Sequence, residues 1–367
     1  MPFHVLRRLL VAAFASTVLA LGGGSAAGAG PIPGPLADLQ SRLDLLSARA
    51  PGHIGVIIKD LATGLTTGIN ESANMPAASV IKIPVMVEVF RQMATGAFDL
   101  NRQVTLEGSD RDWGWGDLVG GRTGSRYTVA RLLRLMITES DNTATNMLIR
   151  LVGRAHINAT MTELGLRQTR LADYIRSDGD IRSLRTSPLD MTKLLDAMAH
   201  DRLIDQWSSR AMIAILTGQH HNGLLPEPLP PGTPVAHKTG TLHDTLNDVG
   251  IVYLNTEPYI IAVLTTQLPT LNAGRQFIRG VSRLAYDALG KFASWREANP
   301  LAGFASDGAD SPPAATQPLP DVQMWEPAPT SDDTSAPRAV PTPEAPTLLP
   351  APTPVPTAVP VSPGPAR

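Results

Sequence analysis

The chain contains no cysteine, and this absence removes several kinds of chemistry at once. Disulfide bonds, thiolate metal sites and cysteine nucleophiles are all excluded. Lysine is scarce as well, and arginine carries most of the positive charge. The only lysines are Lys59, Lys82, Lys193, Lys238 and Lys291. Two of them, Lys82 and Lys238, fall inside short motifs.

Strong charge of one sign is also missing. Acidic and basic residues nearly balance and leave a net charge of −2 over 367 residues. Such a chain has no general attraction to nucleic acid or to an anionic membrane, so we expect a small-molecule substrate and neither of those partners. His237 and His243 are expected at the surface rather than as metal ligands, and His220 and His221 lie in a predicted loop and are no better candidates for a metal site. We therefore expect no metal, no cofactor and a monomer.

The two ends of the chain differ in composition from its middle. Residues 1–29 combine Arg7 and Arg8 with an apolar run and a small-residue cleavage site, the pattern of a secretory signal peptide, with an uncleaved anchor as the alternative. Its removal would leave a secreted protein in the periplasm or cell-wall space. Residues 300–367 hold more than half of the 33 prolines and are predicted to be a disordered tail. One folded domain is expected between them, at residues 30–299.

Hydrophobic patterns predict an α+β fold for this domain. Short apolar or alternating runs predict strands at residues 53–60, 65–69, 235–241, 248–254 and 259–266. Leucine spacing, caps and breaks predict helices at residues 36–50, 79–96, 128–138, 143–152, 156–164 and 272–293, and more than one helix between residues 187 and about 216. The strands should form one antiparallel five-stranded sheet flanked by helices, with an all-helical lobe and a cleft beside it. Trp113 and Trp115, in the glycine-rich segment 107–126, either line this cleft or pack the loop.

One apolar stretch carries the first chemical signal. Ser79 stands at its start and Lys82 follows three residues later, so both side chains lie on one face of the predicted helix. A lysine in an apolar helix is costly to bury in its charged form, which lowers its pKa and lets it act as a base. A hydroxyl beside such an amine is a candidate nucleophile. The alternative for an isolated pair is a capping serine and a lysine whose amine reaches solvent.

Two more motifs follow in order, Ser-Asp-Asn at residues 140–142 and Lys-Thr-Gly at residues 238–240. Each motif alone is common, the first as a turn between helices and the second as a strand end. Together with Ser79 and Lys82 they form the ordered motif set of class A β-lactamases and penicillin-binding proteins. The sequence resembles the class A β-lactamase family over roughly residues 36–293. Further segments that look like this family are Thr169–Leu171, Thr186–Met191 and Asn247-Asp248.

The resemblance implies a serine hydrolase acylated by β-lactam amides, and the chemistry of the residues agrees. Ser79 attacks a carbonyl, and Lys82 takes its proton when neutral. The backbone N–H groups of Ser79 and Thr241 are the expected donors to the oxyanion. Ser140 relays a proton to the leaving nitrogen. Lys238 supplies positive charge that attracts a substrate carboxylate, so Ser79, Lys82, Ser140 and Lys238 are the expected catalytic residues.

The remaining motif residues are expected to bind substrate. Thr239 and Thr241 can hydrogen-bond the carboxylate, and Gly240 lies between them on the same strand. Asn142 can bond both the amide of the substrate side chain and the amine of the catalytic lysine. Asp141 is expected to be structural, folding the loop through contacts with its own backbone.

One loop departs from the family pattern. Class A β-lactamases carry a glutamate after the Thr-Arg-Leu motif, where it orients the deacylating water. Here no glutamate occurs between Glu163 and Glu227. Asp173, Asp178 and Asp180 are the candidates to replace it, but an aspartate is one methylene shorter. Acylation is therefore expected to be intact, and hydrolysis of the acyl-enzyme is expected to be slow.

Three functions remain open at this point. The first is a class A β-lactamase-like hydrolase that turns over β-lactams slowly. The second is a D-alanyl-D-alanine carboxypeptidase-like peptidase of the cell wall. The third is a module that binds β-lactams or wall fragments without hydrolysing them. Turnover of a chromogenic cephalosporin identifies the first, and release of D-alanine from a wall peptide identifies the second.

Overall fold

A five-stranded antiparallel sheet organises the computed structural model, which describes residues 34–177, 183–254 and 257–299. Its strand order is β2-β1-β9-β8-β7. The strands are β1 (His53–Asp60), β2 (Thr66–Ile69), β7 (Val235–Leu242), β8 (Thr245–Tyr253) and β9 (Pro258–Thr266). Strands from both ends of the domain pair along β1 and β9, which confirms the predicted sheet. The predicted signal peptide and proline-rich tail lie outside the described residues.

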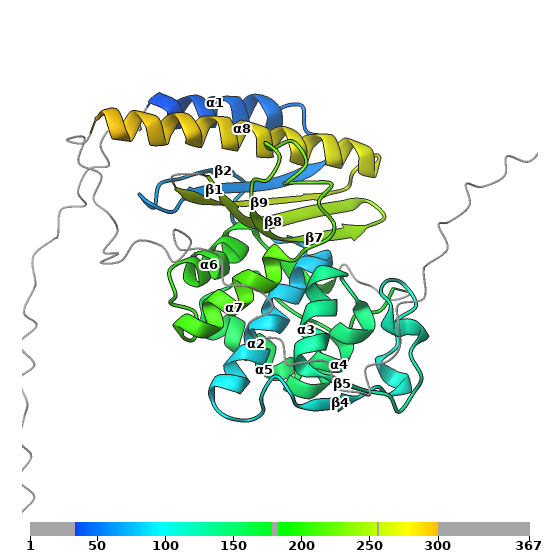
Figure 1. The fold of residues 1–367 in the computed structure, drawn as a ribbon. Helices are drawn as coiled ribbons and strands as arrows, with labels where there is room; N and C mark the ends of the chain where they lie inside the picture. Colours follow the sequence, from blue (N-terminus) through cyan, green and yellow to red (C-terminus); the bar gives the residue numbers. More distant parts are fainter. Residues whose placement is uncertain (1–33, 178–182, 255–256, 300–367) are drawn as a thin grey trace, which may run out of the picture. The chain divides into compact units, whose positions relative to one another are not determined.

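Two helices cover one face of the sheet, α1 (Gly34–Ser47) and α8 (Leu271–Ala298) (Figure 1). Leu39 and Leu43 of α1 and Ile278 of α8 are fully or almost fully buried in an apolar core against the sheet. These residues recur at helical spacing, so each helix presents one apolar stripe to the strands. Burying such a side chain contributes about 1.5–3 kcal/mol.

The helical lobe lies against the other face of the sheet (Figure 1). Its helices are α2 (Lys82–Ala94), α3 (Val129–Thr138), α4 (Asn142–Val152), α5 (Arg154–Glu163), α6 (Pro188–Ala199) and α7 (Gln206–Thr217). Helix α2 is buried along residues 82–90 and contacts α3, α4, α5 and α7, so it is the centre of the lobe. Two small ladders join the lobe segments, β3 (Met75–Pro76) with β6 (Arg185–Thr186) and β4 (Gln103–Thr105) with β5 (Arg126–Thr128).

The helix predicted from Ser79 begins differently from the prediction. Residues Ala78–Ile81 form a 3₁₀ turn, η1, and the α-helix starts only at Lys82. Pro84 provides the reason, because it lacks the N–H that would bond the Val80 carbonyl in an α-helix. Proline is tolerated in the first turn of a helix, so α2 has to start close to it.

The edge strand β7 lies beside η1, and this contact brings the sheet and the lobe together. The segment of residues 107–126 adds two short 3₁₀ turns, η2 (Gly108–Asp110) and η3 (Leu118–Gly120). Among the described helices, none has both the length and the apolar character needed to cross a membrane.

Candidate active site

The backbone before Ser79 is held tightly against the sheet. Asn247 of β8 donates from its amide to the carbonyls of Pro76 at 2.9 Å and Ala77 at 3.1 Å. Ala78 then takes a left-handed conformation with φ of 47°, which costs free energy in a residue with a Cβ. This anchored, strained turn places Ser79 in the wall of a cavity between the lobe and β7.

Lys82 lies one 3₁₀ turn after Ser79, and its N–H donates to the Ser79 carbonyl. Its side chain is fully buried, and its amine nitrogen lies within hydrogen-bonding distance of three oxygens. These oxygens are the Ser140 carbonyl at 2.5 Å, the Ser140 hydroxyl at 3.1 Å and Asn142 Oδ1 at 2.7 Å. Burial lowers the pKa of Lys82 well below its ordinary value, and the charge of Lys238 lowers it further.

The turn that presents Ser140 and Asn142 is built by the aspartate between them. Asp141 caps α4 by accepting the Ala144 N–H at 2.7 Å, and its other oxygen accepts the Leu118 N–H at 2.8 Å. Ser140 has a left-handed φ of 60°, which the capped turn maintains. These contacts match the structural role expected for Asp141.

Lys238 approaches the same hydroxyl from the sheet. Its amine donates to Ser140 Oγ at 3.0 Å and to the Thr239 carbonyl at 3.0 Å, and the side chain is fully buried. Burial lowers the pKa of Lys238 to about 7, against the opposing effect of the Asp248 carboxylate. Its charge at neutral pH is therefore partial rather than fixed.

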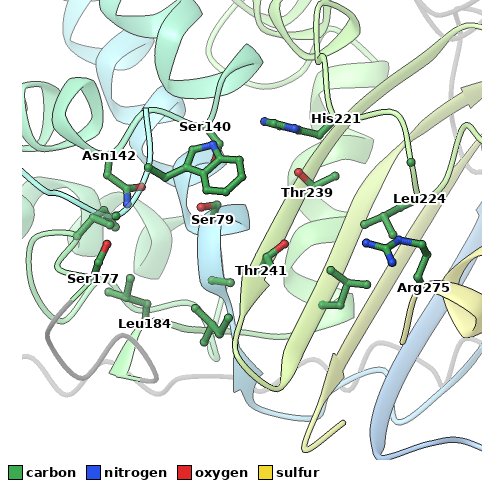
Figure 2. Close-up of a pocket in the computed structure, with 17 residues that line it drawn as sticks. Ser79, Ser140, Asn142, Ser177, Leu184, His221, Leu224, Thr239, Thr241 and Arg275 are labelled. Atoms are coloured by element: carbon green, nitrogen blue, oxygen red, sulfur yellow. The ribbon is translucent and has the colours of Figure 1, made fainter. Parts of the chain in front are cut away.

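A cavity of about 390 Å³ opens over these residues (Figure 2). Of the residues predicted to act, Ser79, Ser140, Asn142, Thr239 and Thr241 line it. The two lysines stand behind this lining and reach it through the Ser140 hydroxyl.

Gly240 is placed against the backbone rather than in the lining. A Cβ at this position would lie 3.1 Å from both the Ala77 carbonyl oxygen and the Ser79 nitrogen. Such contacts are tighter than a side chain normally allows, so glycine here lets β7 pack closely on η1. The glycine of the Lys-Thr-Gly motif is therefore explained by the close packing of strand β7 against the turn η1.

The two tryptophans of the glycine-rich segment differ in their relation to the cavity. Trp115 donates from its indole N–H to the Glu139 carbonyl at 2.9 Å and contacts His221 edge-on. Trp115 lines the cavity although it is 56% exposed, whereas Trp113 is 80% exposed and does not line it. Of the two interpretations of the tryptophans, the cleft wall holds for Trp115.

A third cation lies in the cavity wall. Arg275 reaches it from the start of α8 (Figure 2). No local motif marks this arginine, because it enters the site only when α8 crosses the sheet. It adds positive charge to the wall of the cavity.

Of the three aspartates that are candidates to replace the missing glutamate, only Asp173 lies among the described residues, and it does not line the cavity. Asp173 is 70% exposed in its side chain and pairs with Arg154 at 3.4 Å, while Asp178 and Asp180 lie outside the described residues. Ile175 lines the cavity instead. Asn146 clamps its backbone by accepting the Ile175 N–H at 2.8 Å and donating to its carbonyl at 3.0 Å.

A different carboxylate, Asp112, reaches the site. It is 3% exposed, and one oxygen accepts Asn142 Nδ2 at 2.7 Å and the Ser177 hydroxyl at 2.6 Å. The backbone N–H groups of Ser177 at 2.6 Å and Gly114 at 3.1 Å complete the set. Burial acts to raise the pKa of Asp112, but these hydrogen bonds outweigh it and hold the pKa below its ordinary value.

Two glycines that follow Asp112 mark the loop that carries it, although not the aspartate. A Cβ at Gly114 would collide with the Ser177 side chain, and one at Gly116 would collide with Asp141. Gly116 also has a φ of 114°, which other residues rarely adopt. Both glycines are thus required for the loop to pack against the site, although nothing in the pattern identified Asp112 itself.

One histidine prediction is wrong. His237 is completely buried, because its ring pairs with Asp248 at 2.9 Å and with Asn222 Oδ1 at 3.0 Å. Asp248 lies on the neighbouring strand β8, diagonally across from His237. Its hydrogen bond to the imidazole offsets the cost of burying that polar ring. His243 is 76% exposed in its side chain, in agreement with the prediction.

Comparison with known proteins agrees with this site. The profile of the beta-lactamase enzyme family matches residues 38–289. A beta-lactamase of Streptomyces lavendulae is 28% identical over 300 residues, which cover 77% of this chain and 97% of the relative.

Solved structures share the fold. The beta-lactamase of Sphaerobacter thermophilus is 31% identical with a TM-score of 0.65, covering 70% of this chain and 98% of that one. The protein PBP-A is 30% identical with a TM-score of 0.67, covering 71% and 99%. A leucine-to-glutamate variant of PBP-A, equally similar, was solved as an acyl-enzyme complex with penicillin G.

The family profile spans well over half of the chain, and the fold agrees with solved beta-lactamases along nearly their whole length. The stretch that the profile matches includes the strands of the sheet and the helices of the lobe. The chain is therefore a serine hydrolase that belongs to the beta-lactamase enzyme family.

Proposed function

We propose that the protein is acylated at Ser79 by β-lactam amides and hydrolyses the resulting ester slowly. One observation carries this proposal: a continuous hydrogen-bonded chain from Lys238 through Ser140 and Lys82 to Asn142 borders the cavity that Ser79 lines. Buried amines and hydroxyls in such a chain can take a proton from a nucleophile and deliver it to a leaving group.

Each member of the chain has a distinct role. Lys82 is the base that takes the Ser79 proton, since burial and its cationic neighbour favour its neutral form. Ser140 passes a proton to the departing β-lactam nitrogen, and Lys238 supports it from the sheet. The N–H groups of Ser79 and Thr241 bind the oxyanion.

The substrate carboxylate binds at the β7 end of the cavity. Thr239 and Thr241 line this end and provide hydroxyl donors, with Lys238 behind them and Arg275 beside them. Asn142 binds the amide of the substrate side chain at the opposite end. This arrangement fits a small molecule with an anionic group on one side and an amide on the other.

Hydrolysis is expected to be slow because the cavity wall opposite β7 is apolar. Ile175 and Leu184 line it with apolar side chains, and no carboxylate is among the described residues that line the cavity. An acyl-enzyme has no carboxylate base on the described part of this wall, and losing a positioned base costs about 10²–10⁴ in rate.

A D-alanyl-D-alanine carboxypeptidase-like activity is the second candidate. The observation that favours it is the likeness to PBP-A, together with the apolar residue at Ile175. A peptide ending in a carboxylate would use the same cation-lined end of the cavity. A module that is acylated without turnover is the third.

We also propose that the protein is exported and that its catalytic domain has the following limits. We infer that residues 1–29 are a signal peptide, that residues 30–299 form the hydrolase and that residues 300–367 take no part in catalysis. Removal of the signal peptide would leave an extracytoplasmic protein. We propose that it acts as a monomer without a cofactor.

Intact-mass spectrometry with penicillin G tests the proposal. The expected result is a single adduct that maps to Ser79, persists for minutes and then decays to free enzyme. Rapid decay with turnover of a chromogenic cephalosporin would contradict slow hydrolysis. Release of D-alanine from a wall peptide without cephalosporin turnover would favour the peptidase, and absence of any adduct would refute acylation.

A further inference from the structure

Ser177 is the one hydroxyl that the loop after the Thr-Arg-Leu motif contributes to the described cavity lining. Its hydrogen is committed to Asp112 Oδ2 at 2.6 Å. An ionised carboxylate can only accept, so the direction of this bond is fixed. The lone pairs of Ser177 Oγ are left for a partner in the cavity. Asp112 therefore makes Ser177 a hydrogen-bond acceptor.

Asp112 also fixes the orientation of the Asn142 amide, and it leaves that residue as a hydrogen-bond donor to the cavity. The Asn142 amide nitrogen donates one hydrogen to Asp112 at 2.7 Å, and its oxygen accepts from Lys82. Its second amide hydrogen is left for the cavity. An acceptor on Ser177 and a donor on Asn142 thus lie on this wall (Figure 2). One oxygen of Asp112 bonds to both residues.

The rest of this wall offers no competing polar side chain among the described lining residues. Ile175 and Leu184 are apolar, and Gly114 has its N–H bonded to Asp112. The Trp115 indole N–H is bonded to a backbone carbonyl. A water on this side of an acyl-enzyme can be held by Ser177, while Asn142 keeps its free N–H for the substrate amide.

We propose that Ser177, oriented by Asp112, binds the water that hydrolyses the Ser79 acyl-enzyme. The inference rests on the acylation proposed above. The water gives one hydrogen bond to Ser177 Oγ, which leaves its other hydrogen and a lone pair for reaction. Its oxygen bonds to the acyl carbon as its proton passes to neutral Lys82. The ester bond to Ser79 Oγ then breaks, and Lys82 returns the proton to that oxygen.

Ser177→Ala is the first test, with penicillin G as the probe. Acylation and decay are followed separately by intact mass, with decay measured after excess penicillin is removed. The adduct should form at nearly the wild-type rate and decay about tenfold more slowly, the factor carried by one hydrogen bond. Ser177→Thr keeps the hydroxyl and should restore most of the decay rate. Ser109→Ala, an exposed serine of η2, is the matched control and should change neither rate.

A second nucleophile separates water binding from a structural role. Hydroxylamine brings its own basic nitrogen, so it should release the acyl group equally fast from wild type and from Ser177→Ala. If Ser177 only fastens the loop, acylation, hydrolysis and hydroxylamine release should all fall together. That result would overturn the inference, as would decay of the Ser177→Ala adduct at the wild-type rate.

Asp112→Asn extends the test to the orienting group. Asparagine can donate as well as accept, so it no longer fixes Ser177 as an acceptor, and decay should slow as in Ser177→Ala. If the adduct of a folded Asp112→Asn protein decays at the wild-type rate, Asp112 does not orient Ser177 for hydrolysis. A long-lived wild-type adduct with unaffected variants would leave the proposed function standing, whereas a wild type that forms no adduct removes both proposals.

Discussion

The attraction of Lys238 for anionic substrates is expected to weaken as the pH rises through about 7, the pKa to which burial lowers this amine. A lysine carries its charge below its pKa and loses it above, so the attraction is present in mildly acidic solution and absent in mildly basic solution. This direction is opposite to that of a carboxylate acting as a base.

The size of the effect follows from the position of the pKa. One unit below it, about 90% of the amine is charged, and one unit above it about 10% is charged. If only the charged form attracts the carboxylate, kcat/KM for an anionic β-lactam should fall about tenfold between pH 6 and pH 8, relative to a neutral ester. Arg275 keeps its charge throughout, so some preference for anions should persist.

The assay compares a penicillin with its methyl ester over this pH range. Titration of Lys82 affects acylation by both compounds, so it cancels in the ratio of their kcat/KM values. Lys238→Arg cannot lose its proton and should flatten the ratio, whereas Lys193→Met, an exposed lysine on α6, should leave the wild-type slope. A ratio that does not change with pH in wild type would refute the role of Lys238. The same slope in Lys238→Arg would assign the titration to another group.

Further expected outcomes concern the nucleophile, the cavity wall and the tail. Ser79→Ala should abolish labelling by fluorescent penicillin with little change in melting temperature, and undiminished labelling would disprove the assignment. Ile175→Glu should place a carboxylate on the cavity wall and speed adduct decay by up to about 10²–10⁴, whereas Ile175→Gln should not, as intact mass over time would show. A chain ending at residue 299 should keep its activity and cooperative melting, and loss of either would show that residues 300–367 support the domain.

Periodicity located the strands and helices because burial enforces it. Strand β1 matches its predicted residues, and α3 begins directly after Thr128, whose side chain accepts the Arg131 N–H. The start of the Ser79 helix was misplaced because apolar periodicity does not distinguish a 3₁₀ turn from an α-helix. Pro84 was the available signal, since it restricts where the α-helix can begin.

The site was predictable to the extent that its chemistry is local in sequence. The segments at Ser79, residues 140–142 and residues 238–240 each carry their residues within one turn or strand end. Asp112 and Arg275 instead reach the cavity through tertiary packing of a loop and of a distant helix. A lone aspartate or arginine has no pattern that indicates which side chains it will meet after folding.

Buried charged groups give Ser140 and Ser177 opposite hydrogen-bonding roles in the cavity. Two lysines leave Ser140 as a donor, and Asp112 leaves Ser177 as an acceptor. Ser140 Oγ accepts from Lys82 at 3.1 Å and from Lys238 at 3.0 Å, which occupies both of its lone pairs and leaves its hydrogen to be donated. Ser177 Oγ gives its hydrogen to Asp112 and can only accept. Acylation needs a donor at the leaving nitrogen, and hydrolysis needs an acceptor for a water. The cations therefore suit Ser140 to the first step and the anion suits Ser177 to the second, so removing each hydroxyl should slow a different step.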